Sequence, residues 1–123
     1  MLDCISSIQD NDKISLIPTM GNLHKGHLSL INHSKNHPSK IIVSIFVNPL
    51  QFNDADDFKN YPTSLESDLN ILQKQGVDYV FVPDKDEIIH LDIKYISLPT
   101  GFNTELCGKF RPGHFEGVLT IVK

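Results

Sequence analysis

The sequence lacks the features that mark several large classes of protein. None of its apolar runs approaches the roughly 18 residues that a membrane-spanning helix needs, so no membrane partner is expected. Its 11 Lys and Arg against 15 Asp and Glu give a formal net charge of -4, which argues against a nucleic-acid partner. The opening MLDCISSIQDND has no basic region followed by an apolar segment, so no signal peptide is expected. These absences predict a cytoplasmic protein.

Cysteine is also scarce, and so is any sign of several domains. The two cysteines, Cys4 and Cys107, lie far apart and match no metal-binding or redox spacing. We interpret them as reduced thiols of a cytosolic protein. The chain has 123 residues, with no repeat, linker or low-complexity segment, and its length allows one domain at most.

What the sequence contains is an alternation of strand and helix patterns. Short apolar runs predict strands over residues 13–19, 40–49 and 77–84, with a further strand over 94–99. The run KIIVSIFVNP is apolar almost throughout, which is typical of a parallel strand buried on both faces. Strands that alternate with helices predict an α/β fold, in which a parallel sheet is flanked by helices.

Helical spacing fills two of the intervals. Residues 26–36 form the first expected helix, with Leu28, Ile31 and Leu30 directed inward. The second begins after Thr63 or Ser64 and ends at a glycine. Its expected capping box pairs Thr63 with Glu66. The helical spacing comes from Leu65, Leu69 and Leu72, and the helix is expected to end at Gly76. Residues 50–62 are expected to form a loop with one helical turn.

A short motif stands between the first strand and the first helix. The stretch PTMGNLHKGHLSLI places His24 and His27 three residues apart, where the strand ends. Ligands of open parallel sheets bind outside the carboxyl ends of the strands. The N–H groups and positive dipole at a helix start attract anions, and both imidazoles can donate to phosphate oxygens. Gly21 and Gly26 would let the backbone turn or a ligand approach closely. The motif therefore predicts a phosphate site.

Simpler interpretations exist for each of these residues. His24 and His27 can be surface histidines, or a metal pair, although no third ligand has a suitable spacing. The P-loop and the dinucleotide-binding glycine pattern are both absent. Several other polar side chains are interpreted as solvated rather than metal-binding, namely His33, His37, Asp54, Asp56 and Asp57.

Four blocks in one order resemble the pantothenate synthetase (pantoate–β-alanine ligase) family of the nucleotidylyltransferase superfamily. They are PTMGNLHKGHLSLI, SIFVNPLQF, DDFKNYP and LCGKFRPGHFEGV. The resemblance implies a Rossmann-like fold of the HIGH type, here truncated. Because members of the family are much longer, it also implies that residues 1–123 form a single incomplete N-terminal domain. The C-terminal domain would be absent, and the 123 residues alone would be inactive.

The activity that the resemblance implies is a two-step ligation. The carboxylate of pantoate attacks the α-phosphorus of ATP, with magnesium on the phosphates, and gives pantoyl adenylate and pyrophosphate. The amine of β-alanine then attacks the acyl carbon, and pantothenate and AMP leave. The family usually dimerises through this domain, so a homodimer is expected. Another adenylyl- or cytidylyltransferase with an HxGH loop and a non-catalytic binding module remain as alternatives.

The motif positions also carry site residues over from the family. His27 matches the catalytic donor, with His24 beside it, and Gln51 matches a glutamine that contacts pantoate near the β-alanine site. Thr19, Met20 and Asn48 are expected to line the same pocket. The ATP-contacting loop comprises Met20, Gly21, Asn22, Leu23, His24, Lys25, Gly26 and His27. No metal ligand is expected on the protein.

Three further residues are left open. Arg111 and His114 either face the substrate carboxylate or phosphates, or only form a turn and a helix start. Tyr61, which precedes a proline, is either a lid contact or a packing residue.

Overall fold

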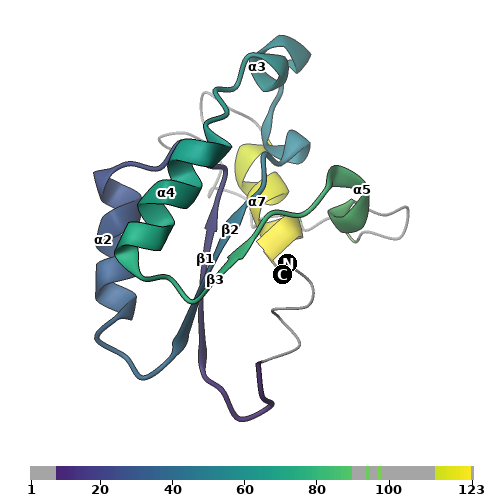
Figure 1. The fold of residues 1–123 in the computed structure, drawn as a ribbon. Helices are drawn as coiled ribbons and strands as arrows, with labels where there is room; N and C mark the ends of the chain where they lie inside the picture. Colours follow the sequence, from purple (N-terminus) through teal and green to yellow (C-terminus); the bar gives the residue numbers. More distant parts are fainter. Residues whose placement is uncertain (1–7, 90–93, 95–96, 98–112, 123) are drawn as a thin grey trace. The chain divides into compact units, whose positions relative to one another are not determined.

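The computed structural model describes residues 8–89, 94, 97 and 113–122 of the chain. The contacts divide the chain into two compact units, the first combining the segment that ends at Phe46 with Pro62–Pro83, the second combining Val47–Tyr61 with the segment from Asp84 onward. The elements, in chain order, are β1 (Ile14–Thr19), α2 (Lys25–Ser34), β2 (Lys40–Ile45), the 3-10 turn η1 (Pro49–Gln51), α3 (Ala55–Lys59), α4 (Leu65–Gln75), β3 (Tyr79–Phe81), α5 (Lys85–Ile88) and α7 (His114–Val122) (Figure 1).

The first unit contains a three-stranded parallel sheet in the order β1-β2-β3. β1 pairs with β2 from Ile14 opposite Lys40 to Thr19 opposite Ile45. The pairing of β2 with β3 is shorter and ends at Ser44 opposite Phe81. This arrangement confirms the parallel α/β fold expected from the alternating pattern. The second and third strands are shorter than the expected runs over 40–49 and 77–84.

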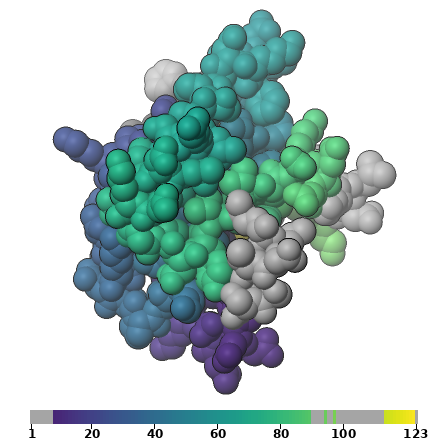
Figure 2. Space-filling view, viewed as in Figure 1, coloured from purple at the N-terminus to yellow at the C-terminus, as the bar shows by residue number. Residues whose placement is uncertain are grey.

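Both long helices of this unit cover the same face of the sheet (Figure 1). Ile31 of α2 and Leu72 of α4 have no exposed surface, and both join the core cluster that the strands form with Ile17, Ile41, Val43 and Ile45. Lys35 just after α2 also donates a hydrogen bond to the Gln75 side chain at the end of α4. In the space-filling view α2 and α4 form one continuous outer layer (Figure 2).

The central strand β2 is buried on both faces, as its apolar run predicts. Its alternate residue Ile42, which points away from the α2 and α4 core, is also buried. β1 differs, because Ile14 and Leu16 are about half exposed. Alternation along a strand places such residues on the face opposite Ile17.

Helix α2 buries a narrower stripe than expected. Leu28 packs against the core and Ile31 is fully buried, but Leu30 is 55% exposed, so the inward direction predicted for Leu30 is wrong. Residues three or four apart share a helix face, and position 30 lies off the face that 28 and 31 define.

Helix α4 corrects the expected capping box. Its N-cap is Ser64, whose side chain makes no cap hydrogen bond, and no Thr63–Glu66 box forms. The Ser64 hydroxyl instead donates to the Asp68 carboxylate at 3.3 Å. Leu65 and Leu69 are exposed, whereas positions 64, 68 and 72 lie on the inner face. The expected end at Gly76 is confirmed by its left-handed φ of 65°.

The second unit holds short helices and α7. The segment over 50–62 contains η1 as well as the expected helical turn, which is α3 and is capped by Asp54. Phe52 meets the rings of Phe58 and Tyr61 edge-on, each at 5.5 Å between centroids. Helix α7 begins at His114, directly after Gly113, which has φ of 79°. The expected strand over 94–99 lies outside the described residues except for positions 94 and 97, and so do both cysteines.

Of the helices that the structure describes, none has both the length and the apolar character needed to span a membrane.

The two leucines of α4 allow a matched test of the core. Leu72→Ala should lower the free energy of unfolding by about 2–5 kcal/mol, because it leaves a cavity between α4 and the sheet. Leu69→Ala, at a position that is 37% exposed, should cost less than about 1 kcal/mol. Urea unfolding of both variants, followed by circular dichroism, measures the difference. Equal losses would show that Leu72 does not anchor the core.

Candidate functional site

The loop between β1 and α2 is attached to the sheet through Thr19. The Thr19 hydroxyl donates to the Ser44 carbonyl oxygen at 2.8 Å and accepts from the Gly21 N–H at 3.1 Å. The Phe46 N–H donates to the Thr19 carbonyl, which continues the pairing beyond the last residue of β2. Thr19 is buried, so its side chain fixes the start of the loop rather than presenting a free polar group.

Two residues with positive φ turn the chain at this edge of the sheet. Gly21 has φ of 78° and Asn22 has φ of 52°. A Cβ on Gly21 would also lie 3.0 Å from the Asp68 Oδ2 and 3.2 Å from the Ile45 side chain. Glycine is therefore required here both for its conformation and for the close approach of α4. The turn places the next residues at the start of α2.

Asp68 holds the loop in this position, and our sequence reasoning did not identify it. Its Oδ2 accepts from the Asn22 N–H and its Oδ1 from the Leu23 N–H, each at 2.8 Å. The side chain is 1% exposed. The sequence carries one signal for it, because Asp68 occupies the inward stripe of α4 between Ser64 and Leu72. An acid at such a position requires buried donors.

The two histidines cap the start of α2 reciprocally. His24 is the N-cap residue, and its Nδ1 accepts from the Gly26 N–H at 3.1 Å. His27 Nδ1 accepts from the His24 N–H at 3.2 Å, and the ring centroids lie 4.2 Å apart. A ring nitrogen that accepts carries no hydrogen, so each neutral ring has its proton on Nε2. No described residue accepts from either Nε2, and the pair therefore presents two N–H donors.

This geometry changes the role expected for Gly26. Its N–H is occupied by His24 and is not free for an anion. A Cβ at this position would lie 2.9 Å from the His24 Cε1 and 3.1 Å from its Nδ1. Gly26 thus makes room for the His24 ring rather than for a bound group. The Nε2–H groups of the two rings remain as donors for a ligand.

The surroundings of His27 favour its neutral form. Desolvation lowers the pKa of His27 below its usual 6.5, and the nearby His24 lowers it further. The Asp68 carboxylate opposes them and raises the pKa, but the net direction is downward. At neutral pH His27 is therefore an uncharged Nε2–H donor.

The second group of expected site residues lies in the other unit. The Asn48 side chain is 1% exposed, donates to the Gly117 carbonyl at 2.9 Å and accepts from the Leu50 N–H at 3.0 Å. A Cβ on Gly117 would overlap the Leu50 carbonyl, so η1 and α7 meet backbone to backbone. Asn48 therefore ties the NPLQ turn to α7.

Gln51 follows on this turn. It is 9% exposed, and no described residue hydrogen-bonds its side-chain amide, which leaves that amide available to a ligand. The main chain of Gln51 is bound as well, since its carbonyl oxygen accepts from the His114 Nδ1 at 3.1 Å.

The remaining expected site residues are placed only in part. Tyr61 packs on Phe52. Arg111 lies outside the described residues. His24 and His27 therefore form one cluster and Gln51, Asn48 and His114 another, each within its own unit.

The described residues hold no preformed cluster of metal ligands. They contain no group of three or more His, Cys, Asp or Glu side chains close enough to share a metal ion. The Asp68 oxygens are both occupied by loop N–H groups. Asp54, Asp56 and Asp57 are exposed on and beside α3, as expected, and Asp54 caps that helix. His33 and His37 are exposed, which is also as expected.

Comparison with known proteins gives one consistent family. The family model described as pantoate-beta-alanine ligase matches residues 1–123. The pantothenate synthetase of Neisseria meningitidis serogroup C is 48% identical over 111 residues, which cover 89% of this chain and 40% of that protein. The pantoate--beta-alanine ligase of Schizosaccharomyces pombe is 45% identical over 117 residues, or 93% of this chain and 41% of that protein.

Solved structures agree with this result. The crystal structure of the pantoate-beta-alanine ligase from Francisella tularensis, complexed with beta-gamma ATP and beta-alanine, superposes with a TM-score of 0.84 at 44% identity. It is matched over 95% of this chain and 45% of its own. The pantothenate synthetase of Thermus thermophilus gives a TM-score of 0.87 at 35% identity, over 98% of this chain and 44% of its own. The chain spans about 40% of the length of the curated relatives it matches.

The capping geometry predicts how His27 responds to pH. Since its pKa is lowered in the folded chain, the unfolded chain takes up the proton first as the pH falls. The associated stability is complete above the unfolded value of 6.5 and is lost as the pH falls from there through the folded pKa. An NMR titration of the His27 ring should give a midpoint below 6.5, and His27→Gln should remove this part of the pH dependence of unfolding. His33→Gln, on the exposed side of α2, is the control. A midpoint at or above 6.5 would contradict the capping geometry.

Proposed function

The chain belongs to the pantoate-beta-alanine ligase family, and on this premise we propose that it carries the nucleotide-binding part of an ATP-dependent ligase that joins pantoate to β-alanine. The observation that carries the proposal is the His24–His27 pair, whose two Nε2–H groups have no partner among the described residues at the carboxyl end of a parallel sheet. The Francisella tularensis relative, complexed with beta-gamma ATP and beta-alanine, supports the same substrates here.

In the first step the pantoate carboxylate attacks the α-phosphorus of ATP, and pyrophosphate leaves. Negative charge then builds on the phosphorus oxygens and the leaving group. His24 and His27 stabilise this charge through their Nε2–H groups, which their Nδ1 bonds hold in a fixed direction. His27 can donate this hydrogen bond in its neutral form, and its lowered pKa favours that form. Neither ring needs to act as a nucleophile, because the substrate carboxylate supplies the attacking oxygen.

The second step joins β-alanine to the pantoyl adenylate and releases AMP. Gln51 is our candidate for orienting pantoate during both steps. Its amide offers two donors and an acceptor oxygen, which suits the two hydroxyls and the carboxylate of pantoate. Thr19 and Asn48 contribute indirectly, since their polar atoms fix the loop after β1 and the NPLQ turn. Met20 remains a candidate pocket residue.

Magnesium enters this proposal only as the counter-ion of the ATP phosphates. The described residues contain no group of three or more possible ligands, and no step is assigned to the ion. A homodimer and a cytoplasmic location stay predictions from the family resemblance and the sequence. We also propose that residues 1–123 form one incomplete N-terminal domain of the ligase.

A full-length chimera tests the proposal. It joins these 123 residues to the part of the Francisella tularensis ligase that they do not match. We expect pantoate-dependent exchange of pyrophosphate into ATP, and His27→Ala should slow it by about 100- to 1000-fold, the usual loss for a transition-state donor. Gln51→Ala should weaken pantoate binding by about 1–3 kcal/mol with ATP binding nearly unchanged, because substrate groups lose a buried partner.

Matched substitutions keep this test specific. His33→Ala removes an exposed histidine from the same helix, and Gln73→Ala removes an exposed glutamine from α4. Neither should change exchange or binding. A folded chimera without pantoate-dependent exchange would refute the ligase. If Gln51→Ala reduced ATP binding and spared pantoate, another nucleotidylyltransferase would become the better assignment.

The isolated 123-residue chain should form no pantothenate from ATP, pantoate and β-alanine. The chain spans about 40% of the length of its relatives, and we propose that the remainder completes the nucleotide site. Exposed apolar side chains such as Leu119 and Val122 of α7 should also favour association of the isolated chain. Chromatography of the reaction mixture measures product, and light scattering measures association. Pantothenate formed by the isolated chain would show that these residues suffice.

A further inference from the structure

Asp68 of α4 accepts hydrogen bonds from a loop that lies far away in the sequence. Its carboxylate accepts from the Asn22 and Leu23 N–H groups, and the Ser64 hydroxyl adds a third donor to Oδ2. The two loop N–H groups belong to residues 45 and 46 positions earlier in the chain. The side chain thus fixes a remote segment rather than its own helix.

Only a carboxylate matches this set of donors. Its two oxygens are acceptors, so both loop N–H groups can bind at once. An asparagine of the same shape has one acceptor and would turn an NH₂ group toward one of the N–H donors. Gly21 also approaches Asp68 so closely that a Cβ would lie 3.0 Å from Oδ2. Three successive loop residues, Gly21, Asn22 and Leu23, therefore lie against the carboxylate.

The same contacts determine the positions of His24 and His27 at the start of α2. Asn22 and Leu23 lead directly into His24, which caps α2 and whose N–H binds the His27 ring. A shift of the Leu23 backbone would move the His24 ring and its Nε2–H with it. Within the described part of the chain, the titratable groups that act on His27 are His24 at the start of the same helix and Asp68 on α4.

Resting on the proposed function, we propose that Asp68 is a positioning residue of the nucleotide site. Its carboxylate holds the backbone of residues 21–23 and so sets the direction in which His24 and His27 offer their Nε2–H groups to the phosphates. It does not touch the substrate in this proposal. Loss of the carboxylate should affect ATP rather than pantoate.

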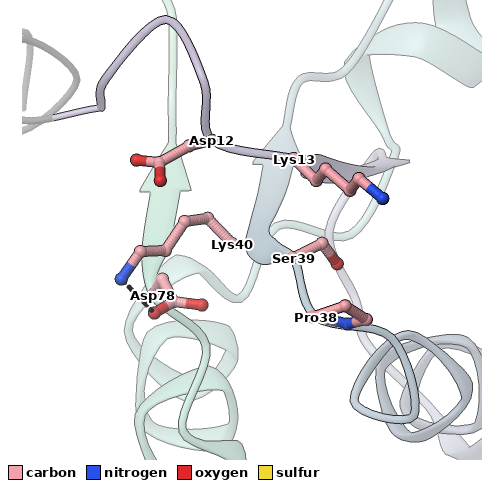
Figure 3. A pocket seen from close by; sticks show the side chains of 6 residues that line it. All are labelled: Asp12, Lys13, Pro38, Ser39, Lys40 and Asp78. Atoms are coloured by element: carbon pink, nitrogen blue, oxygen red, sulfur yellow. Dashed lines mark ion pairs between the residues drawn. The ribbon is translucent and has the colours of Figure 1, made fainter.

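A second aspartate of the same unit provides the matched control. Asp78 accepts from the Ile41 N–H at 2.9 Å and pairs with the Lys40 ammonium at 3.7 Å. It lies at the amino ends of the strands, beside a polar hollow of about 240 Å³ lined by Asp12, Lys13, Pro38, Ser39, Lys40 and Asp78 (Figure 3). Asp78→Asn removes the same charge and weakens a comparable backbone bond away from the loop.

Three readouts compare Asp68→Asn with Asp78→Asn. In the 123-residue chain, Asp68→Asn should speed hydrogen exchange of the Asn22 and Leu23 amides by about 10- to 100-fold, the range for a lost bond to a charged acceptor. It should also lower the pKa of His27, since the charge that raises it is gone. In the full-length chimera, the dissociation constant for ATP should rise about tenfold or more, while that for pantoate holds. Asp78→Asn should change none of these.

The outcomes separate this inference from the proposed function. If hydrogen exchange of the loop amides and the His27 pKa were both unchanged in Asp68→Asn, the positioning role would be overturned. Faster hydrogen exchange of the loop amides with an unaltered affinity for ATP would overturn it too. A wild-type chimera that folds and binds no ATP would instead refute the nucleotide site. If Asp68→Asn fails to fold, hydrogen exchange of the loop amides in the unmodified chain tests the positioning role instead. Asn22 and Leu23 amides protected about tenfold or more over an unstructured peptide support the role, and unprotected amides overturn it.

Discussion

A buried carboxylate is the constraint on which the rest of the first unit depends. Burying the charge of Asp68 is costly unless donors replace the lost water, and the loop after β1 supplies them from its backbone. The loop in turn has no regular pairing of its own and needs an acceptor for these N–H groups. The carboxylate and the loop N–H groups satisfy each other's hydrogen bonds. The positions of α4, the turn at Gly21 and the start of α2 therefore depend on one another.

The histidine pair uses both nitrogens of each ring for different purposes. The Nδ1 atoms replace the serine or aspartate oxygens that cap most helices, and the Nε2 atoms remain as donors. This division ties the chemistry to the fold, because a ring that rotated to serve a ligand would uncap the helix. It also favours the neutral state, since a proton on the His27 Nδ1 would displace the His24 N–H.

The sequence predicted the parts of the fold that depend on local pattern. The almost continuous apolar run of β2 indicated a strand buried on both faces, and the glycine at position 76 indicated the end of α4. The HxGH spacing located the loop. Side chains with remote partners were beyond such reasoning. The Thr63–Glu66 box looked complete locally, but Ser64 directs its hydroxyl to Asp68, and the donors that Asp68 serves lie more than forty residues away. Gly26 likewise serves a neighbouring ring that spacing alone cannot place.

The long reach of Asp68 has a consequence for synthesis of the chain. The loop of residues 20–24 is translated well before α4, so its anchor does not yet exist when it leaves the ribosome. The β1, α2 and β2 segments can begin to pair earlier, because their contacts are closer in sequence. The loop therefore takes its final shape only after α4 has emerged and docked, and the nascent chain cannot hold its histidines in place before that moment.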